Sequence, residues 1–104
     1  MHALKPIAKD SIPRALQKAE RYRLLNEPWE AESICRDVLA ADPDNQQAKI
    51  CLILAMTDLF AVRRGRVNDL RTLVASLASS FDRAYYAGVI EERWAKSLDR
   101  KSVV

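Results

Sequence analysis

The sequence predicts an all-α fold of five antiparallel helices in one small domain. Apolar residues recur every three or four positions in five successive segments, which is the spacing that lines one face of a helix. Only 2 residues are glycine and 49% are hydrophobic, as expected of an ordered chain rich in helix formers. No segment alternates as a half-buried strand does, and short polar turns separate the periodic segments. These observations predict helices packed around a single modest core.

The first predicted helix follows a flexible N-terminal arm, residues 1–10, which has no clear period. Ser11 is placed to cap this helix through its hydroxyl, and Pro13 follows where a missing amide hydrogen costs least. Asn26 and Pro28 end the helix, and Pro28 also opens the next one. The residues that share its apolar face are Leu16, Ala19, Tyr22 and Leu25.

The second and third predicted helices are separated by a strong turn, Asp42–Asn45. Trp29 begins the second helix and is expected to pack against the first, which makes it a better core candidate than Trp94. Asn45 or Asp44 is expected to cap the third helix. Because that helix is apolar on most of its circumference between residues 48 and 60, it is predicted to be the central one.

The fourth and fifth predicted helices follow a basic turn, Arg63–Arg66. The fourth helix is expected to end, and the fifth to be capped, at Ser79, Ser80 and Asp82. The fifth helix is expected to run from about Asp82 to Leu98, so that the helical domain spans residues 11–99 and residues 100–104 fray. The apolar stripe of the fourth helix consists of Val67, Leu70, Leu73, Val74 and Leu77. The stripe of the fifth helix consists of Tyr86, Ile90 and Trp94.

One segment, Glu27–Asn45, resembles the second helix and closing turn of a tetratricopeptide repeat. Ala19 and Ala31 stand where that family keeps small residues, Tyr22 where it keeps an aromatic one, and Pro43 in its helix-ending turn. Three positions depart from the family pattern: Lys18, Asn26 and Cys35. The resemblance implies a short α-solenoid with one good repeat, one degenerate repeat and one extra C-terminal helix. An ordinary helical bundle is the alternative.

The resemblance also implies a function. In tetratricopeptide proteins the first helices of successive pairs line a concave groove that binds an extended peptide or a partner helix. We therefore expect a non-enzymatic scaffold that binds a protein or peptide. The corresponding residues here are Leu16, Glu20 and Arg23 on the first helix, Gln47, Ile50, Leu54 and Asp58 on the third, and Tyr85 and Glu92 on the fifth.

The fifth helix carries more large side chains than a solvated cap needs, among them Tyr85, Tyr86 and Trp94. Helical arrays usually need about three units and a polar cap. We therefore hypothesise that part of this face meets either another chain, which includes a second copy of this one, or a missing continuation of the array.

The sequence offers no combination of residues typical of an active site. His2, the sole histidine, lies in the arm, and no glycine-rich phosphate loop is present. Cys35 and Cys51 occur singly in apolar helical patterns, so they are predicted to be reduced core residues and not zinc ligands. Carboxylate pairs such as Glu91 and Glu92 have basic neighbours, as on a solvated face. We expect no enzyme activity, cofactor or metal.

The alternative function is binding of a nucleic acid or another anion by Arg63–Arg66, with Arg71 nearby, because arginine presents a planar fork to phosphate. The net charge is only +3 and its charges are interspersed, so a nucleic-acid partner is not favoured. No apolar run is long enough to span a membrane, and residues 1–9 contain no secretory signal. A cytoplasmic location is the expectation.

Overall fold

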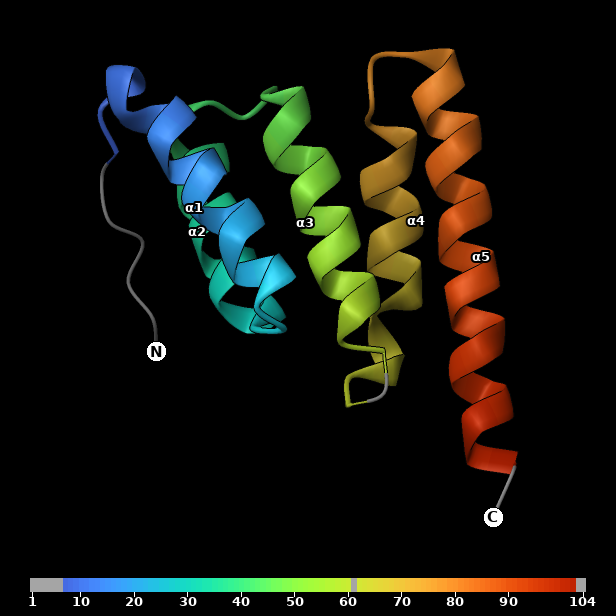
Figure 1. The fold of residues 1–104 in the computed structure, drawn as a ribbon. Coiled ribbons are helices and arrows are strands. Elements are labelled where there is room, and N and C mark those ends of the chain that lie inside the picture. The colour runs from blue at the N-terminus through green and yellow to red at the C-terminus, as the bar shows by residue number, and fades with distance from the viewer. Residues whose placement is uncertain (1–6, 61, 103–104) are drawn as a thin grey trace.

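All elements in the described part of the chain are helical. The computed structural model describes residues 7–60 and 62–102, and no strand occurs in them. Short 3-10 turns at Lys9–Ser11 and Arg64–Arg66 precede the first and fourth α-helices. The predicted all-α class is therefore confirmed. The five α-helices, labelled in Figure 1, are α1 (Ile12–Leu24), α2 (Pro28–Ala41), α3 (Gln46–Asp58), α4 (Val67–Ala75) and α5 (Ser80–Ser102).

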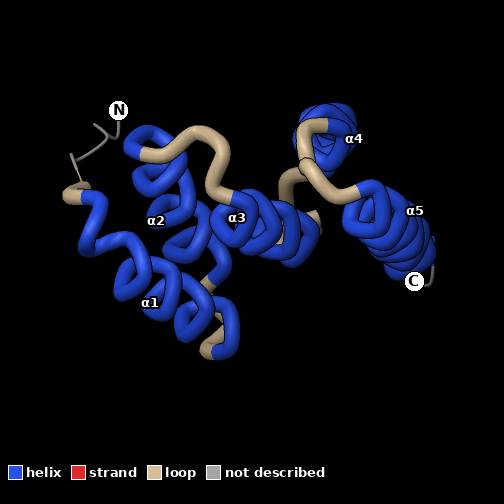
Figure 2. The backbone as a smooth tube through the Cα atoms, turned by 90° about the horizontal axis from the view of Figure 1, so that it is seen from above, coloured by secondary structure: helices blue, strands red, loops and turns tan. Residues whose placement is uncertain are grey.

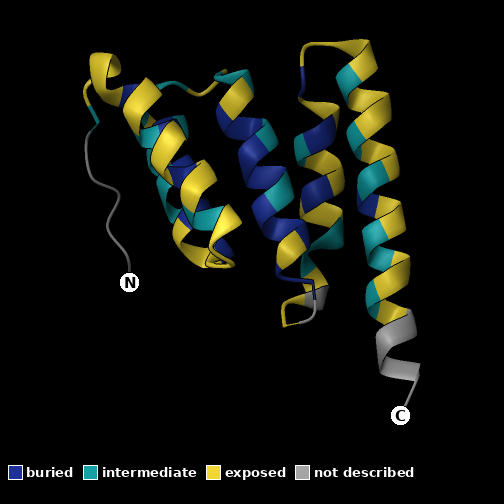
Figure 3. Cartoon of the chain, in the orientation of Figure 1, coloured by how far each residue is buried: buried dark blue, intermediate teal, exposed yellow. Residues whose placement is uncertain are grey.

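The third helix, α3, lies at the centre of the molecule. It packs against each of the other four helices, with α1 and α2 on one side of it and α4 and α5 on the other side (Figure 2). Figure 3 shows α3 buried over most of its surface, and Ile53 and Ala55 are fully buried. The predicted central position of this helix is confirmed, since a helix that is apolar nearly all round must be covered on several sides.

The α1–α2 turn has a well-defined helix-ending geometry. Asn26 adopts a left-handed φ of 62°. The amide of Glu27 donates to the carbonyl of Tyr22 (2.9 Å) and the amide of Asn26 to that of Arg23 (3.0 Å), which is the Schellman pattern. Asparagine tolerates left-handed backbone better than most residues, which explains how it can replace a glycine here.

The start of α1 differs from the prediction. Ser11 precedes the helix but its side chain makes no capping hydrogen bond, because Lys9–Ser11 already form a 3-10 turn and Ser11 itself has helical backbone. Ile7 packs against the small core cluster around Leu16. Residues 1–6 of the predicted arm lie outside the described residues.

Small residues lie where α1 and α2 meet. Ala19 on α1 and Ala31 on α2 are both fully buried in the main core. Cys35 and Cys51 belong to the same core and are free thiols, as predicted. The absence of bulk at the two alanines lets the helix backbones approach closely.

Polar groups tie the α4–α5 loop to α3. Asn45 caps α3 as predicted, with its side chain accepting from the amide of Ala48 (2.8 Å). Lys49 is only 7% exposed, and its Nζ donates to the carbonyl of Ser76 at the end of α4 (3.1 Å). The side chain of Gln46 accepts from the amide of Ala78 (2.9 Å). The first turn of α3 therefore holds the chain that leaves α4.

Helix α5 is attached through a line of large side chains. Ile90 is fully buried, and the ring of Trp94 meets that of Phe60 edge to face, with centroids 5.4 Å apart. The expectation for the tryptophans was wrong, because Trp29 is 54% exposed while Trp94 packs on the core. Trp29 lies at the first turn of α2, where the preceding chain turns away and leaves its ring in solvent.

The boundaries of α5 are wider than predicted. The helix begins at Ser80, and the hydroxyl of Ser79 accepts from the amide of Asp82 (3.2 Å). Its backbone remains helical to Ser102, beyond the expected end at residue 98, and residues 103–104 lie outside the described residues. In the described part of the chain, no helix combines the length and apolarity needed to cross a membrane.

Candidate functional site

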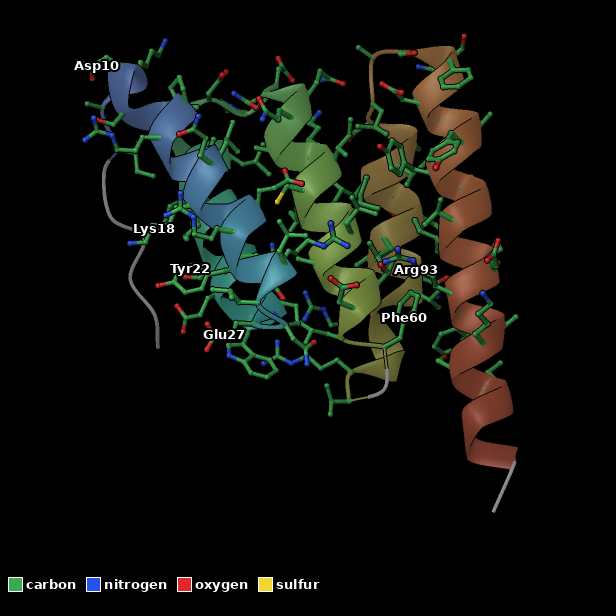
Figure 4. The ribbon with its side chains drawn as sticks, viewed as in Figure 1. Asp10, Lys18, Tyr22, Glu27, Phe60 and Arg93 are labelled. Atoms are coloured by element: carbon green, nitrogen blue, oxygen red, sulfur yellow. The ribbon has the colours of Figure 1, made fainter. Side chains whose placement is uncertain are left out.

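A single carboxylate joins three helices on one face of the molecule. The Nε of Arg23 on α1 donates to Asp58 Oδ2 on α3 (2.8 Å), and the Nη1 of Arg93 on α5 donates to Asp58 Oδ1 (3.1 Å). Arg93 Nη1 also donates to Thr57 Oγ1 (2.8 Å). Figure 4 shows Arg93 extending from α5 towards α3. We call Arg23, Asp58 and Arg93 the three-helix cluster.

Helix ends set the electrostatics of the three-helix cluster. Asp58 is the last residue of α3, where the partial negative charge of the helix terminus disfavours a carboxylate. Two guanidinium groups offset this cost and leave the cluster with one excess positive charge. The side chains of Arg23, Asp58 and Arg93 are 19%, 26% and 38% exposed, so water and a partner can still reach them.

Tyr86 extends the same face towards the N-terminal end of α5. Burial raises the pKa of its phenol, and the charges of Asp82, Arg23 and Glu20 also act on that pKa. Tyr86 is half-buried and packs against the main core from α5. Glu20 is exposed and is available on this face.

The other residues predicted to line the groove differ in how far their side chains are exposed. Leu16 is only 3% exposed and belongs to the small core cluster with Val38, because its position on α1 points at α2. It cannot contact a partner in this conformation. Ile50 and Leu54 are half-buried, and Ile50 packs against the main core. Gln47 is exposed in the first turn of α3.

Tyr85 and Glu92 are exposed residues of α5, and the ring of Tyr85 meets that of Tyr86 edge to face, with centroids 4.9 Å apart. Tyr85 is 56% exposed and its ring stacks with that of Phe81, with centroids 6.2 Å apart. Glu92 accepts a hydrogen bond from Lys96 (3.1 Å). Tyr85 therefore borders the face that Tyr86 extends.

The sequence interpretation missed Arg93. This residue lies one heptad after Tyr86 and three residues after Ile90, so helical spacing places it on the inward side of α5. An arginine at an inward position needs a charged partner, and the aspartate at the end of α3 supplies one. The register of α5 against α3 was the information that the sequence lacked.

Arg66, the last arginine of the basic turn, is engaged in an internal ion pair. Arg66 Nη2 lies 2.6 Å from Glu32 Oε2, and Arg36 Nε lies 2.9 Å from the same oxygen. Burial alone would raise the pKa of Glu32, but these two guanidinium groups outweigh it and hold the pKa below its usual value. On α4, Arg71 binds Glu91 of α5 through two hydrogen bonds of 2.7 and 3.0 Å. Arg66 and Arg71 are therefore not free to bind phosphate.

Two open clefts lie elsewhere on the described surface. One, of about 340 Å³, runs between α3 and α4 and is bordered by Arg36 of α2. The other, of about 280 Å³, lies between α4 and α5. The first cleft contains the hydroxyls of Thr72 and Ser76, but both donate to backbone carbonyls of α4 and not to a base. No group of three or more histidine, cysteine or carboxylate side chains among the described residues is arranged to hold a metal ion.

In the three-helix cluster two of the predicted site residues, Arg23 and Asp58, are in direct contact, and Arg93 joins them from α5. None of the known protein-family models, curated proteins or solved structures compared with this chain matches it.

Proposed function

We propose that this chain is an interaction scaffold of the tetratricopeptide type, which binds a peptide or a partner helix across α1, α3 and α5. The observation that carries the proposal is the three-helix cluster, in which Asp58 links side chains from three alternate helices on one face. A ligand that crosses these helices contacts all three at once.

The packing pattern supports the repeat arrangement. Beyond the contacts between consecutive helices, α3 packs against both α1 and α5, so the alternate helices also form a continuous row. The buried Ala19–Ala31 crossing and the left-handed Asn26 agree with the resemblance in the first helix pair. The same row is what a groove built from first helices requires.

The charges of the face favour a ligand with at least one carboxylate. Asp58 accepts from one nitrogen of Arg23 and one of Arg93. Each guanidinium has five N–H donors, so further donors remain for a ligand. Ile50 and Leu54 add half-buried apolar surface beside them. An acidic peptide with one or two apolar side chains fits this combination, with a few anchor residues supplying most of the binding energy.

The test is affinity capture with the wild-type chain and two double variants, followed by mass spectrometry. Arg23→Gln with Arg93→Gln removes both positive charges and changes the net charge of the three-helix cluster from positive to negative. Arg14→Gln with Arg21→Gln makes the same chemical change at exposed positions of α1 and is the matched control. We expect the captured partners to be lost only with the first pair.

A displayed library of random peptides provides a direct measurement on the same variants. We expect selected peptides to be enriched in aspartate and glutamate and to lose affinity for Arg23→Gln/Arg93→Gln, with circular dichroism showing an intact helix content. If the same partners and peptides bind all three proteins, the face has been assigned incorrectly.

A further inference from the structure

The only two cysteines of the chain meet in the main core. Cys35 lies on α2 and Cys51 on α3, and both are buried free thiols. A hydrogen bond joins the two side chains, with the thiol of Cys35 donating to the sulfur of Cys51. A buried thiol packs as a small apolar group, so alanine or valine would serve the core equally well. Packing alone therefore does not require sulfur on both sides of the same contact.

The register of α2 against α3 brings the two thiols together. The helices are antiparallel (Figure 1), and both cysteines lie eight residues from Pro43 in the turn between them, which places them at the same level. Two further pairs of fully buried residues have the same symmetry about Pro43: Ala31 with Ala55, and Val38 with Ala48. The contact between α2 and α3 is thus a line of small and medium-sized side chains, along which the two backbones can approach closely.

Close approach of the backbones is what a disulfide requires. A disulfide joins residues whose Cα atoms are about 4.4 to 6.8 Å apart. The distance between packed helices depends on the side chains at their contact, and small ones give the shortest distances. Because the sulfurs of Cys35 and Cys51 are already in hydrogen-bond contact, rotation of the two side chains is the main movement that bond formation needs.

The two thiols differ in reactivity. Cys35 is fully buried, whereas Cys51 is 5% exposed. The hydrogen bond from Cys35 lowers the pKa of the Cys51 thiol and Arg23 acts in the same direction, while burial, Glu20 and Asp58 oppose this shift without reversing it. The same hydrogen bond, together with burial, raises the pKa of Cys35. Since the thiolate is the nucleophilic form, Cys51 is the attacking thiol and Cys35 the resolving one.

We propose that Cys35 and Cys51 form an oxidation site, at which a small peroxide converts the thiol pair into a disulfide that fixes α2 against α3. A peroxide suits this site because the slight exposure of Cys51 admits only a small oxidant. The site is independent of the proposed ligand face on α1, α3 and α5.

The reaction has two steps. The Cys51 thiolate attacks one oxygen of hydrogen peroxide, the O–O bond breaks, and the released hydroxide takes up the proton that Cys51 has lost, which leaves a sulfenic acid. The sulfur of Cys35 then attacks the sulfur of Cys51, and the S–O bond breaks as water leaves with the proton of Cys35. Two thiols are oxidised to one disulfide, and one peroxide is reduced to two water molecules.

Peptide mapping of the folded full chain after treatment with hydrogen peroxide tests the site. We expect a disulfide between Cys35 and Cys51 of the same chain, and the return of both thiols with dithiothreitol. The oxidised chain should unfold at a temperature at least about 5 °C higher than the reduced chain, because the bond restricts the unfolded state. Three results would overturn the proposal: thiols that survive peroxide sufficient to oxidise the chain in urea, disulfides between chains, or a lower unfolding temperature after oxidation.

Single alanine variants test the roles of the two thiols. In Cys35→Ala the attacking thiol has no resolving partner, so we expect its sulfenic acid to persist and to be trapped by dimedone. In Cys51→Ala the remaining thiol is fully buried, and it should be oxidised at least about tenfold more slowly than that of Cys35→Ala. Circular dichroism checks that both variants are folded, and the mapping of the wild-type chain decides the proposal if either is not. Equal rates, or a faster reaction of Cys51→Ala, would contradict the assigned order of attack.

Discussion

Helices α1 and α2 have small apolar side chains where they meet, whereas α4 and α5 join the core through large apolar side chains and add polar contacts to the rest of the chain. Ala19 and Ala31 are fully buried between the first helices. At the other end, Lys49 and Gln46 hold the α4–α5 loop, and Glu32 of α2 binds Arg66 before α4. Close helix packing requires small residues at fixed positions, but polar attachment does not.

This difference explains where the repeat signature is found. The residues that resemble the tetratricopeptide pattern all lie in the half built on small-residue packing. In the second half, large buried side chains such as Leu70 and Ile90, together with the ion pair of Arg66, connect the elements, so small residues are not needed at the same positions. The helix arrangement can therefore continue after the signature has ended.

The largest expected effect is at the α1–α2 crossing. Ala31→Leu forces a branched side chain into a position with no exposed surface, and we expect a loss of about 3 kcal/mol from overpacking. Urea denaturation followed by circular dichroism measures the change. Ala40→Leu, the same substitution at an exposed position of α2, should change stability by less than about 0.5 kcal/mol. Similar effects of the two substitutions would show that the alanine crossing is not tightly packed.

The next effect concerns the ion pair that joins α2 to the turn before α4. Glu32→Gln leaves Arg66, whose side chain is 20% exposed, without its counter-charge, and we expect a loss of about 2 kcal/mol at neutral pH. Arg66→Met removes the other partner and frees a buried carboxylate. Both should destabilise the chain more than Arg36→Met, because the side chain of Arg36 is 47% exposed.

The same pair makes stability depend on pH. Because Arg66 and Arg36 lower the pKa of Glu32 in the folded chain, the unfolded chain binds a proton at Glu32 more readily. The contribution of Glu32 is therefore complete above its unfolded pKa of about 4.3, and it is lost as the pH falls through the lower folded value. We expect the stability difference between wild type and Glu32→Gln to narrow between about pH 5 and pH 3. A difference that stays constant over this range would show that Glu32 does not titrate with a lowered pKa.

Local sequence signals predicted the elements better than the contacts between them. Neighbouring residues determine the cap at Asn45 and the turn at Asn26 and Pro28, so the sequence is sufficient to predict both. The central helix is predicted by its strong apolar pattern. Whether Trp29 and Trp94 are buried depends on which helix lies opposite each of them. The residues around Trp29 in the sequence therefore could not predict that its side chain is exposed. For the candidate site, Arg23 and Asp58 were identified, but their mutual contact and the part played by Arg93 depend on the register of α5.

This dependence also changes how the candidate face must be tested. Reversing the charge of Arg23 or of Asp58 alone would break a contact between α1 and α3, so a lost partner would not distinguish binding from folding. Glutamine at Arg23 and Arg93 also removes both ion pairs to Asp58, so circular dichroism must show that the variant is folded before a lost partner is interpreted.

The smallest expected effect lies at the attachment of the α4–α5 loop. Lys49→Met keeps the length of the buried side chain but removes the donor to Ser76 and the positive charge at the end of α4. We expect a global loss of about 1 kcal/mol. Because Lys49 holds one loop, the local effect should be larger than the global one, and amide exchange should accelerate from Ser76 to Phe81 while α1 and α2 are unaffected. Lys96→Met, at a lysine whose side chain is 70% exposed, is the control and should change neither quantity. Uniform acceleration across all five helices would show that the two halves unfold as one unit and that their different packing has no separate energetic consequence.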